Sequence, residues 1–229
     1  MWFHRLAKRV LRLVIPLLLD VRVEGLEHVP RQGRLIVAIN HTNFWDGVLA
    51  TAYLPRDVVG LAKVELFRVP LLGLVLRWYG AVPVHRGEVD RHVLGKAVEA
   101  LQQGRVVSMA PEGTRSKDHR LQRGRDGMAF LAARTGAPVL PMAISGSELF
   151  WSQVVRFRRT PTRIVIGQPF RFTVRGEVER EMLRRMTQEG MYRLAALLPE
   201  GYRGYYSDLS QATRELIEPY RSADQKEAA

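Results

Sequence analysis

The segment IVAINHTNFWDG, residues 36–47, contains the features that decide how this chain folds and where its chemistry lies. Its first four residues are apolar and mostly β-branched, which is typical of a buried strand. The run ends in Asn40 and His41, and Asp46 follows five positions after the histidine. In open α/β sheets, ligands bind at the carboxyl ends of the strands. We therefore expect residues 40–46 to form part of a functional site.

Similar apolar runs recur along the chain and alternate with stretches of helical periodicity. The predicted strands span residues 34–40, 57–62, 81–86, 105–110, 138–145 and 162–170. The predicted helices span residues 46–54, 70–79, 89–103, 125–136 and 177–198. This alternation predicts an α/β fold with a largely parallel mixed sheet flanked by helices. We expect that domain over residues 21–221, between an N-terminal segment, 1–20, and a frayed polar tail, 222–229.

Residues 1–20 show the pattern of a basic amphipathic helix. Apolar side chains recur at intervals of three or four, at Trp2, Leu6, Val10, Leu13 and Leu17. Basic side chains fall mainly on the other side, at Arg5, Lys8, Arg9 and Arg12. The pattern predicts a membrane-associating helix that lies in the bilayer interface, because the longest apolar run, 13–19, is too short to span a membrane. The alternative is a helix packed on the protein's own core with its arginines in solvent.

Composition limits the function classes. The 229 residues contain no cysteine, which excludes disulfides, thiolate metal sites and a cysteine nucleophile. The formal net charge of +12 favours an anionic partner, such as an acidic membrane surface or a phosphorylated substrate. We expect no nucleic-acid partner, because the basic residues are dispersed and no reading motif occurs. No secretory signal is expected either, since arginines run through the N-terminal segment and a small-residue cleavage site is lacking.

His41 and Asp46 have the residue types of a general base and the carboxylate that orients it. If His41 lies in a strand-to-helix loop and Asp46 in the first helical turn, the carboxylate can accept a hydrogen bond from one ring nitrogen. The other nitrogen would then take a proton from a substrate hydroxyl. A serine triad is disfavoured because no G-x-S-x-G elbow occurs, and no second histidine lies at metal-ligand spacing. A purely structural loop histidine remains the alternative.

A second polar cluster, PEGTRS at residues 111–116, follows the predicted strand 105–110. Gly113 permits a tight turn, and Thr114 and Arg115 offer a hydroxyl and a planar cation that suit a phosphate. Glu112 would position an arginine or contact a substrate hydroxyl. Arg86, at the end of the predicted strand 81–86, is a further cation. Taken alone, the loop could equally be a surface turn with an ion pair.

Together these motifs resemble one known family. NHTNFWD, GAVPVHR, PEGTRS and VLPMAI, at 40–46, 80–86, 111–116 and 139–144, occur in the order and spacing of the glycerolipid acyltransferases, most closely the 1-acylglycerol-3-phosphate acyltransferases. The resemblance covers roughly residues 20–206, including RGYYSD near the end. It departs from the usual pattern at Asn43, His85 and Ala110, and a lysine that often follows the PEGTRS loop is replaced by Arg123 or missing.

The resemblance implies transfer of a fatty acyl group from acyl-CoA or acyl carrier protein to the hydroxyl of 1-acylglycerol-3-phosphate, giving phosphatidic acid. It implies that His41 is the general base, that Asp46 orients it, and that no acyl-enzyme, metal or other cofactor takes part. The acceptor phosphate would be bound by Arg86, Glu112, Gly113, Thr114 and Arg115, and Pro141 would shape the pocket. The protein would act at the cytoplasmic face of the cell membrane, as a peripheral or monotopic protein.

Two other functions remain open at this point. The first is the same chemistry on another acceptor, such as a lyso-ornithine lipid, glycerol-3-phosphate or a lysophospholipid. The second is a non-catalytic basic module that binds membranes, in which His41 and Asp46 are structural.

Overall fold

Strand β2 (Leu35–Ile39) lies in the middle of a sheet to which nine strands of the described residues belong, because both of its faces are apolar. In the computed structural model, which describes residues 2–84 and 91–221, β2 pairs in parallel with β5 (Val106–Met109) on one side and β6 (Val139–Ser145) on the other. All five of its residues are buried. Leu35, Val37 and Ile39 contribute to one hydrophobic core, and Ile36 and Ala38 contribute to the core on the opposite face.

The strand order is β1-β7-β6-β2-β5-β3-β4, and β8 and β9 extend the sheet from β6. The remaining strands are β1 (Leu19–Glu24), β3 (Val58–Lys63), β4 (Val82–Val84), β7 (Thr160–Ile166), β8 (Phe170–Phe172) and β9 (Ile217–Pro219). The pairs β1–β7, β2–β5, β2–β6, β3–β5 and β3–β4 are parallel, whereas β6–β7, β6–β8 and β8–β9 are antiparallel. The predicted α/β fold with a largely parallel mixed sheet is confirmed.

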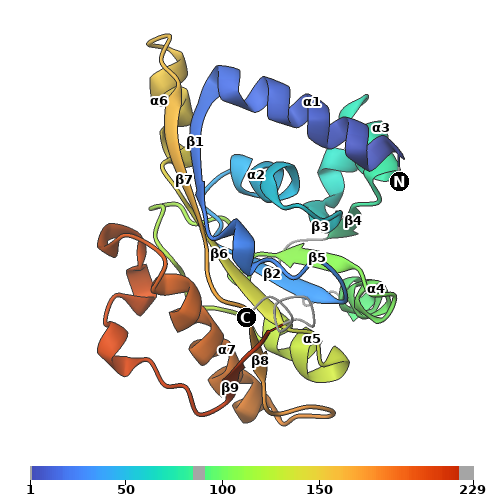
Figure 1. Ribbon diagram of the computed structural model, residues 1–229, viewed down its shortest axis with the longest axis vertical. Helices are drawn as coiled ribbons and strands as arrows, with labels where there is room; N and C mark the ends of the chain where they lie inside the picture. Colours follow the sequence, from blue (N-terminus) through green and yellow to red (C-terminus); the bar gives the residue numbers. More distant parts are fainter. Residues whose placement is uncertain (1, 85–90, 222–229) are drawn as a thin grey trace.

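Helices cover both faces of this sheet (Figure 1). The α-helices are α1 (Trp2–Leu18), α2 (Trp45–Tyr53), α3 (Leu72–Tyr79), α4 (Arg91–Gln102), α5 (Gly127–Thr135), α6 (Phe150–Val154) and α7 (Arg180–Ala195). Short 3-10 helices span 26–28, 64–68, 147–149, 200–202, 204–206 and 209–211. Helices α1 and α2 pack on one face of the sheet, and α4 and α5 pack on the other. None of the helices within the described part of the chain is long and apolar enough to cross a bilayer.

The structure differs from the sequence prediction in several elements, among them β9 (Ile217–Pro219), which was not predicted. Strand β1 was not predicted, because its residues follow directly from the apolar N-terminal helix. The predicted strand 162–170 is divided into β7 and β8 by residues 167–169, where Pro169 cannot donate to a strand ladder. Helix α6 was not predicted either, because a helix of five residues is too short to show a period. The tail 222–229 lies outside the described residues.

Helix α1 turns part of its basic side toward the protein. Lys8 is only 9% exposed, and its Nζ donates to the Leu54 and Arg56 carbonyl oxygens and lies 3.3 Å from Asp57 Oδ1. Arg12 Nε donates to Ala52 O at 2.8 Å. Ala52 and Leu54 lie at the carboxyl end of α2, where carbonyl groups lack helical partners and favour cations. Burial lowers the pKa of Lys8, although Asp57 opposes this shift.

As a result, the apolar stripe of α1 faces outward. Leu13 and Leu17 are 73% and 74% exposed, and Leu6, Val10 and Val14 are also exposed. Helix α3 lies beside α1, with the rings of His4 and Tyr79 4.5 Å apart. It exposes Leu74, Val75 and Trp78 as well. Among the apolar side chains of α1 that the structure describes, only Ile15 is fully buried. The helix therefore contributes little to the core.

Candidate active site

The two polar clusters of the sequence meet because their strands are neighbours. His41 follows β2 and Glu112 follows β5, and these parallel strands end at the same edge of the sheet. The backbone N–H of His41 donates to Glu112 Oε1 at 2.8 Å, and the Ser116 N–H donates to the His41 carbonyl at 2.8 Å. Asn40 holds the end of β2 against β6, since its side-chain amide exchanges two hydrogen bonds with the backbone of Ile144, at 2.7 and 2.8 Å.

His41 and Asp46 are in contact, as the sequence predicted. His41 Nδ1 lies 3.2 Å from Asp46 Oδ2. Asp46 is the second residue of α2, so the strand-to-helix loop brings the carboxylate back to the ring. An ionised carboxylate only accepts hydrogen bonds, so this contact places a proton on Nδ1 and directs the basic lone pair to Nε2. The His41 side chain is 20% exposed, which gives the ring access to the cavity described below.

The Asp46 carboxylate is completely buried and accepts hydrogen bonds from five donors, one of which is Thr42 Oγ1 at 3.4 Å. Besides the ring, Oδ2 accepts from the backbone N–H groups of Thr42 at 2.7 Å and Asn43 at 2.8 Å. Ser147 Oγ donates to Oδ1 at 3.1 Å. Asn43 joins the same network, because its Nδ2 donates to Ser147 Oγ and its Oδ1 accepts from the Trp45 N–H. An asparagine at position 43 therefore shapes the loop that carries the histidine.

Glu112 is a second buried carboxylate, and it is directed at backbone rather than at the cavity. It is 2% exposed. Its Oε1 accepts from the His41 N–H, and its Oε2 accepts from the Gln122 N–H at 2.9 Å. Burial raises the pKa of Glu112 to about 7, although the two backbone hydrogen bonds act in the opposite direction. Glu112 thus holds the loop of His41 through these hydrogen bonds, and its contact with a substrate hydroxyl stays a prediction.

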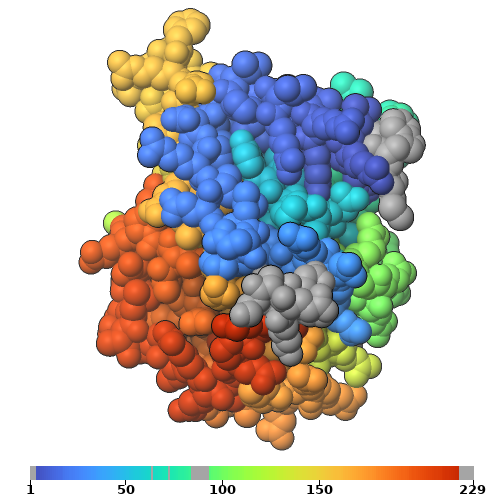
Figure 2. All heavy atoms as spheres, viewed as in Figure 1, coloured from blue at the N-terminus to red at the C-terminus, as the bar shows by residue number. Residues whose placement is uncertain are grey.

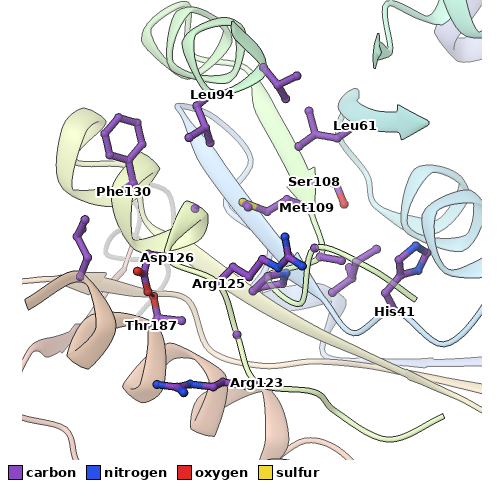
Figure 3. Close-up of a pocket in the computed structure, with 18 of the residues that line it drawn as sticks. His41, Leu61, Leu94, Ser108, Met109, Arg123, Arg125, Asp126, Phe130 and Thr187 are labelled. Atoms are coloured by element: carbon purple, nitrogen blue, oxygen red, sulfur yellow. Dashed lines mark hydrogen bonds between the residues drawn. The ribbon is translucent and has the colours of Figure 1, made fainter. Parts of the chain in front are cut away.

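A cavity of about 1430 Å³ opens beside His41. One part of its wall is apolar and includes Leu61, Leu94, Met109, Phe130 and Leu183. Another part is cationic and includes Arg123, Arg125, Arg134, Arg180 and Arg184. Figure 3 shows the Arg125 side chain between His41 and Asp126. A cavity with a base, a cationic wall and an apolar wall can hold an anionic amphiphile near the base.

The other predicted site residues are placed as follows. Gly113 lines the cavity, has φ 70° and forms a tight turn in which its N–H donates to Ala110 O. Thr114 is half-buried and Arg115 is exposed, and neither belongs to the described lining of the cavity. Pro141 is buried in β6 beside Ala38, away from that lining. Arg86 lies outside the described residues.

The sequence analysis missed Arg125 and Ser147. Arg125 is held against the turn, since a Cβ on Gly113 would come within 2.8 Å of Arg125 Cδ. Its backbone N–H donates to Pro111 O at 2.8 Å. Ser147 follows the carboxyl end of β6, so the rule that led to His41 and Glu112 would also have led to Ser147. No cluster of three or more His, Asp or Glu side chains suited to a metal ion occurs among the residues that the structure describes.

More than half of the chain matches one protein-family model. The family model described as Acyltransferase matches residues 20–145, which contain His41, Asp46 and Glu112. The chain belongs to the acyltransferase family. The matched residues include β2, β5 and the loops that follow them, which carry His41 and Glu112, and α2, which carries Asp46.

Two relatives in the acyltransferase family are both named 1-acyl-sn-glycerol-3-phosphate acyltransferases. The chain is 32% identical, over 63% of its length, to the 1-acyl-sn-glycerol-3-phosphate acyltransferase LPAT1 of Arabidopsis thaliana chloroplasts, and it spans 41% of that protein. It thus spans less than half of this curated relative. It is 28% identical to the 1-acyl-sn-glycerol-3-phosphate acyltransferase of Bacillus subtilis, over 72% of this chain and 81% of that one.

The structure also resembles a crystal structure of a family member. This is the 1-acyl-sn-glycerophosphate (LPA) acyltransferase PlsC of Thermotoga maritima. The TM-score is 0.62 at 27% identity, and the match covers 85% of this chain and 76% of the other. The predicted family resemblance is therefore confirmed.

The buried state of Glu112 predicts a pH dependence of stability. Its pKa is raised from 4.5 to about 7 in the folded chain, so the folded state binds the proton more tightly than the unfolded state. The contribution of protonated Glu112 to the free energy of unfolding is therefore full below about pH 4.5 and is lost as the pH rises through about 7. The measurement is urea unfolding of the wild type and of Glu112→Gln over this pH range. The free energy of unfolding of the wild type minus that of the variant should fall by up to about 3 kcal/mol as the pH rises. A pH-independent difference would contradict the assignment.

Proposed function

We propose that this protein transfers a fatty acyl group from a thioester carrier to the free hydroxyl of 1-acylglycerol-3-phosphate, giving phosphatidic acid. The observation that carries the proposal is the contact between His41 Nδ1 and the buried Asp46 carboxylate, beside a cavity with cationic and apolar walls. The printed names of the relatives from Arabidopsis, Bacillus and Thermotoga support the choice of acceptor. The donor would be acyl-CoA or acyl carrier protein, which both present a thioester.

The proposed reaction follows from the position of the proton on His41. As the acceptor hydroxyl attacks the thioester carbonyl carbon, Nε2 takes the hydroxyl proton and a C–O bond forms. The imidazolium is stabilised by Asp46, which accepts from Nδ1. Collapse of the tetrahedral intermediate breaks the C–S bond, and the leaving thiolate receives the proton from Nε2. The products are the ester and the free thiol, so the enzyme returns to its starting state without an acyl-enzyme.

The cationic wall suits the phosphate of the acceptor. Arg125 projects into the cavity near His41 and packs on the turn at Gly113. A planar guanidinium held in this way is suited to contact with a phosphate monoester. Arg123 lines the same wall. Arg86, Thr114 and Arg115 remain predicted contributors to this site. The apolar wall would contact an acyl chain.

We also infer that the outward stripe of α1 contacts lipid, at the cytoplasmic face of the membrane. Leu13 and Leu17 are mostly exposed, while Lys8 and Arg12 fasten the helix to the carboxyl end of α2. An amphipathic helix with its apolar stripe turned outward is suited to the bilayer interface, where the acceptor lipid is dissolved. Exposed apolar residues of α3 adjoin the same surface.

Replacing His41 by Ala should abolish transfer, because no other group at this position takes the hydroxyl proton. We expect kcat/KM to fall by about 10³-fold or more. Asp46→Asn should cause a large loss as well, since an amide cannot stabilise the imidazolium. The measurement is mass spectrometry of the products formed from lysolipid acceptors with both carrier thioesters. Wild-type turnover by His41→Ala would show that the base is assigned incorrectly.

Replacing Arg125 by Ala should raise KM for 1-acylglycerol-3-phosphate by about 10- to 100-fold, because a charge-assisted contact with phosphate is lost. Lys117→Ala is a matched control, since Lys117 is an exposed cation nearby in the sequence and is absent from the described lining of the cavity. An acceptor that lacks phosphate should respond little to Arg125→Ala. Equal increases for both acceptors would argue against phosphate recognition by this residue and favour another acceptor.

Replacing Leu13 and Leu17 together by Glu should lower binding to phosphatidylglycerol vesicles by about tenfold or more, measured by sedimentation. The substitutions should leave stability unchanged because both side chains are exposed. Leu26→Glu, at an exposed leucine in the 3-10 helix 26–28, is the control. Deleting residues 1–20 is a poorer test, because Ile15 and Leu19 belong to the core. Unchanged sedimentation of the double variant would refute the lipid contact of α1.

A further inference from the structure

A short segment outside the described lining of the cavity exposes several large apolar side chains. Residues 149–159, here called the α6 finger, connect the 3-10 helix 147–149 to β7 and contain α6. Trp151 is 75% exposed, Val155 is 72% exposed and Phe157 is 100% exposed. Leu149 is 45% exposed. Figure 2 shows the finger as a protrusion at one corner of the molecule, beside the end of α1.

The finger combines these apolar side chains with positive charge. Its sequence, LFWSQVVRFRR, contains three arginines, Arg156, Arg158 and Arg159, and no acidic residue. All three arginines are exposed. Exposed aromatic and aliphatic side chains interleaved with arginines are the composition of segments that enter the interface of an anionic bilayer. The charge thus favours an anionic lipid surface over a neutral apolar partner.

Contacts with the rest of the protein hold the finger in place and leave the side chains of Val155 and Phe157 exposed. The ring of Phe150 packs on Trp45, with centroids 4.9 Å apart, and the rings of Phe150 and Trp151 meet edge to face, with centroids 5.1 Å apart. Arg159 Nη1 donates to Pro16 O at 3.3 Å, and its Nη2 lies 3.9 Å from Asp20 Oδ1. These contacts fix the finger to the end of α1, and Figure 1 shows α6 beside the junction of α1 and β1.

Phe157 at the tip is the most informative residue. Its φ is 54°, a left-handed conformation that favours glycine over a phenylalanine. The chain therefore accepts an unfavourable backbone conformation and a fully exposed ring at the same position. Neither feature contributes to packing within the described part of the protein.

We propose that the α6 finger inserts its apolar tip into an anionic bilayer and forms a second membrane contact, distinct from α1. Trp151, Val155 and Phe157 would enter the interface, and Arg156 and Arg158 would lie among the anionic headgroups. With α1, the finger would give the protein two separate points of contact. This goes beyond the proposed function, because it concerns binding to the membrane and holds for whichever acceptor is used.

The first test removes the apolar tip. Trp151→Asp with Phe157→Asp should lower binding to vesicles that contain phosphatidylglycerol by about tenfold or more. The control, Leu26→Asp with Gln103→Asp, makes the same change in net charge at two exposed positions away from the finger. Thermal unfolding should be unaffected in both variants, because none of these side chains is buried. Binding that stays within about twofold of the wild type would overturn the proposal.

The second test reports insertion directly. The chain has no cysteine, so Phe157→Cys gives a single attachment point for an environment-sensitive thiol fluorophore. Addition of phosphatidylglycerol vesicles should shift the emission of this label to shorter wavelength. A label at Glu177→Cys should not respond, since this side chain is 96% exposed in the loop that follows β8. A label at position 157 that stays in water while the protein is bound to vesicles would also overturn the proposal.

A third measurement separates the finger from catalysis. The finger is not part of the described cavity lining, so the tip variant should keep wild-type turnover of a short-chain acceptor dissolved in water. Turnover of an acceptor embedded in vesicles should fall in proportion to the loss of binding. A loss of turnover on the dissolved acceptor would contradict the assignment of the finger to membrane binding. If the wild type binds vesicles through the finger but transfers no acyl group, the proposed function fails and the finger contact stands.

Discussion

The buried carboxylate of Asp46 is the constraint on which the site depends. Moving a carboxylate out of water costs several kcal/mol unless its oxygens find donors. Here two backbone N–H groups, a serine hydroxyl and the His41 ring supply them, at 2.7–3.2 Å. Because the two backbone donors belong to the loop between β2 and α2, the conformation of the loop and the orientation of the ring are coupled. The loop cannot change without leaving a buried charge unsatisfied.

A second buried carboxylate acts on the same histidine from another side. Glu112 accepts from the backbone N–H of His41, whereas Asp46 accepts from its ring. The two acids come from neighbouring strands, and the negative charge of Asp46 contributes to the raised pKa of Glu112. His41 is thus held through both its main chain and its side chain. The order of the parallel strands explains this arrangement, because β2 and β5 must end side by side.

Much of the fold could be predicted from the sequence, because the central strands are continuous apolar runs separated by helical periods. The contact of His41 with Asp46 could be predicted for the same reason, since both residues flank one strand-to-helix turn. For α1 the sequence predicted a membrane-associating helix but left packing on the core as the alternative, because a helical period separates two faces without saying which one meets the protein. The capping of α2 by Lys8 and Arg12 decides that question, and it depends on residues about 40 positions away in the chain.

Arg125 could not be predicted from the sequence for a similar reason. Arg125 belongs to the site because it packs on the turn at Gly113, a contact that no spacing rule expresses. The backbone N–H of Gly124 donates to the buried hydroxyl of Tyr206, so the segment that carries Arg125 is placed by residues near the end of the chain. Long-range contacts of this kind become visible only in three dimensions. The role of Glu112 as an acceptor of backbone N–H groups is another example.

The junction between α1 and the sheet has a mechanical consequence. Helix α1 ends at Leu18 and β1 begins at Leu19, so there is no linker between them. Strand β1 is in turn paired along its whole length with β7, which the finger precedes. A flexible segment between a helix and a sheet would let the two turn independently, whereas here the helix passes directly into a paired strand. Whatever its outward helix rests on, the sheet edge that carries the histidine is held at a single tilt and a single height above it.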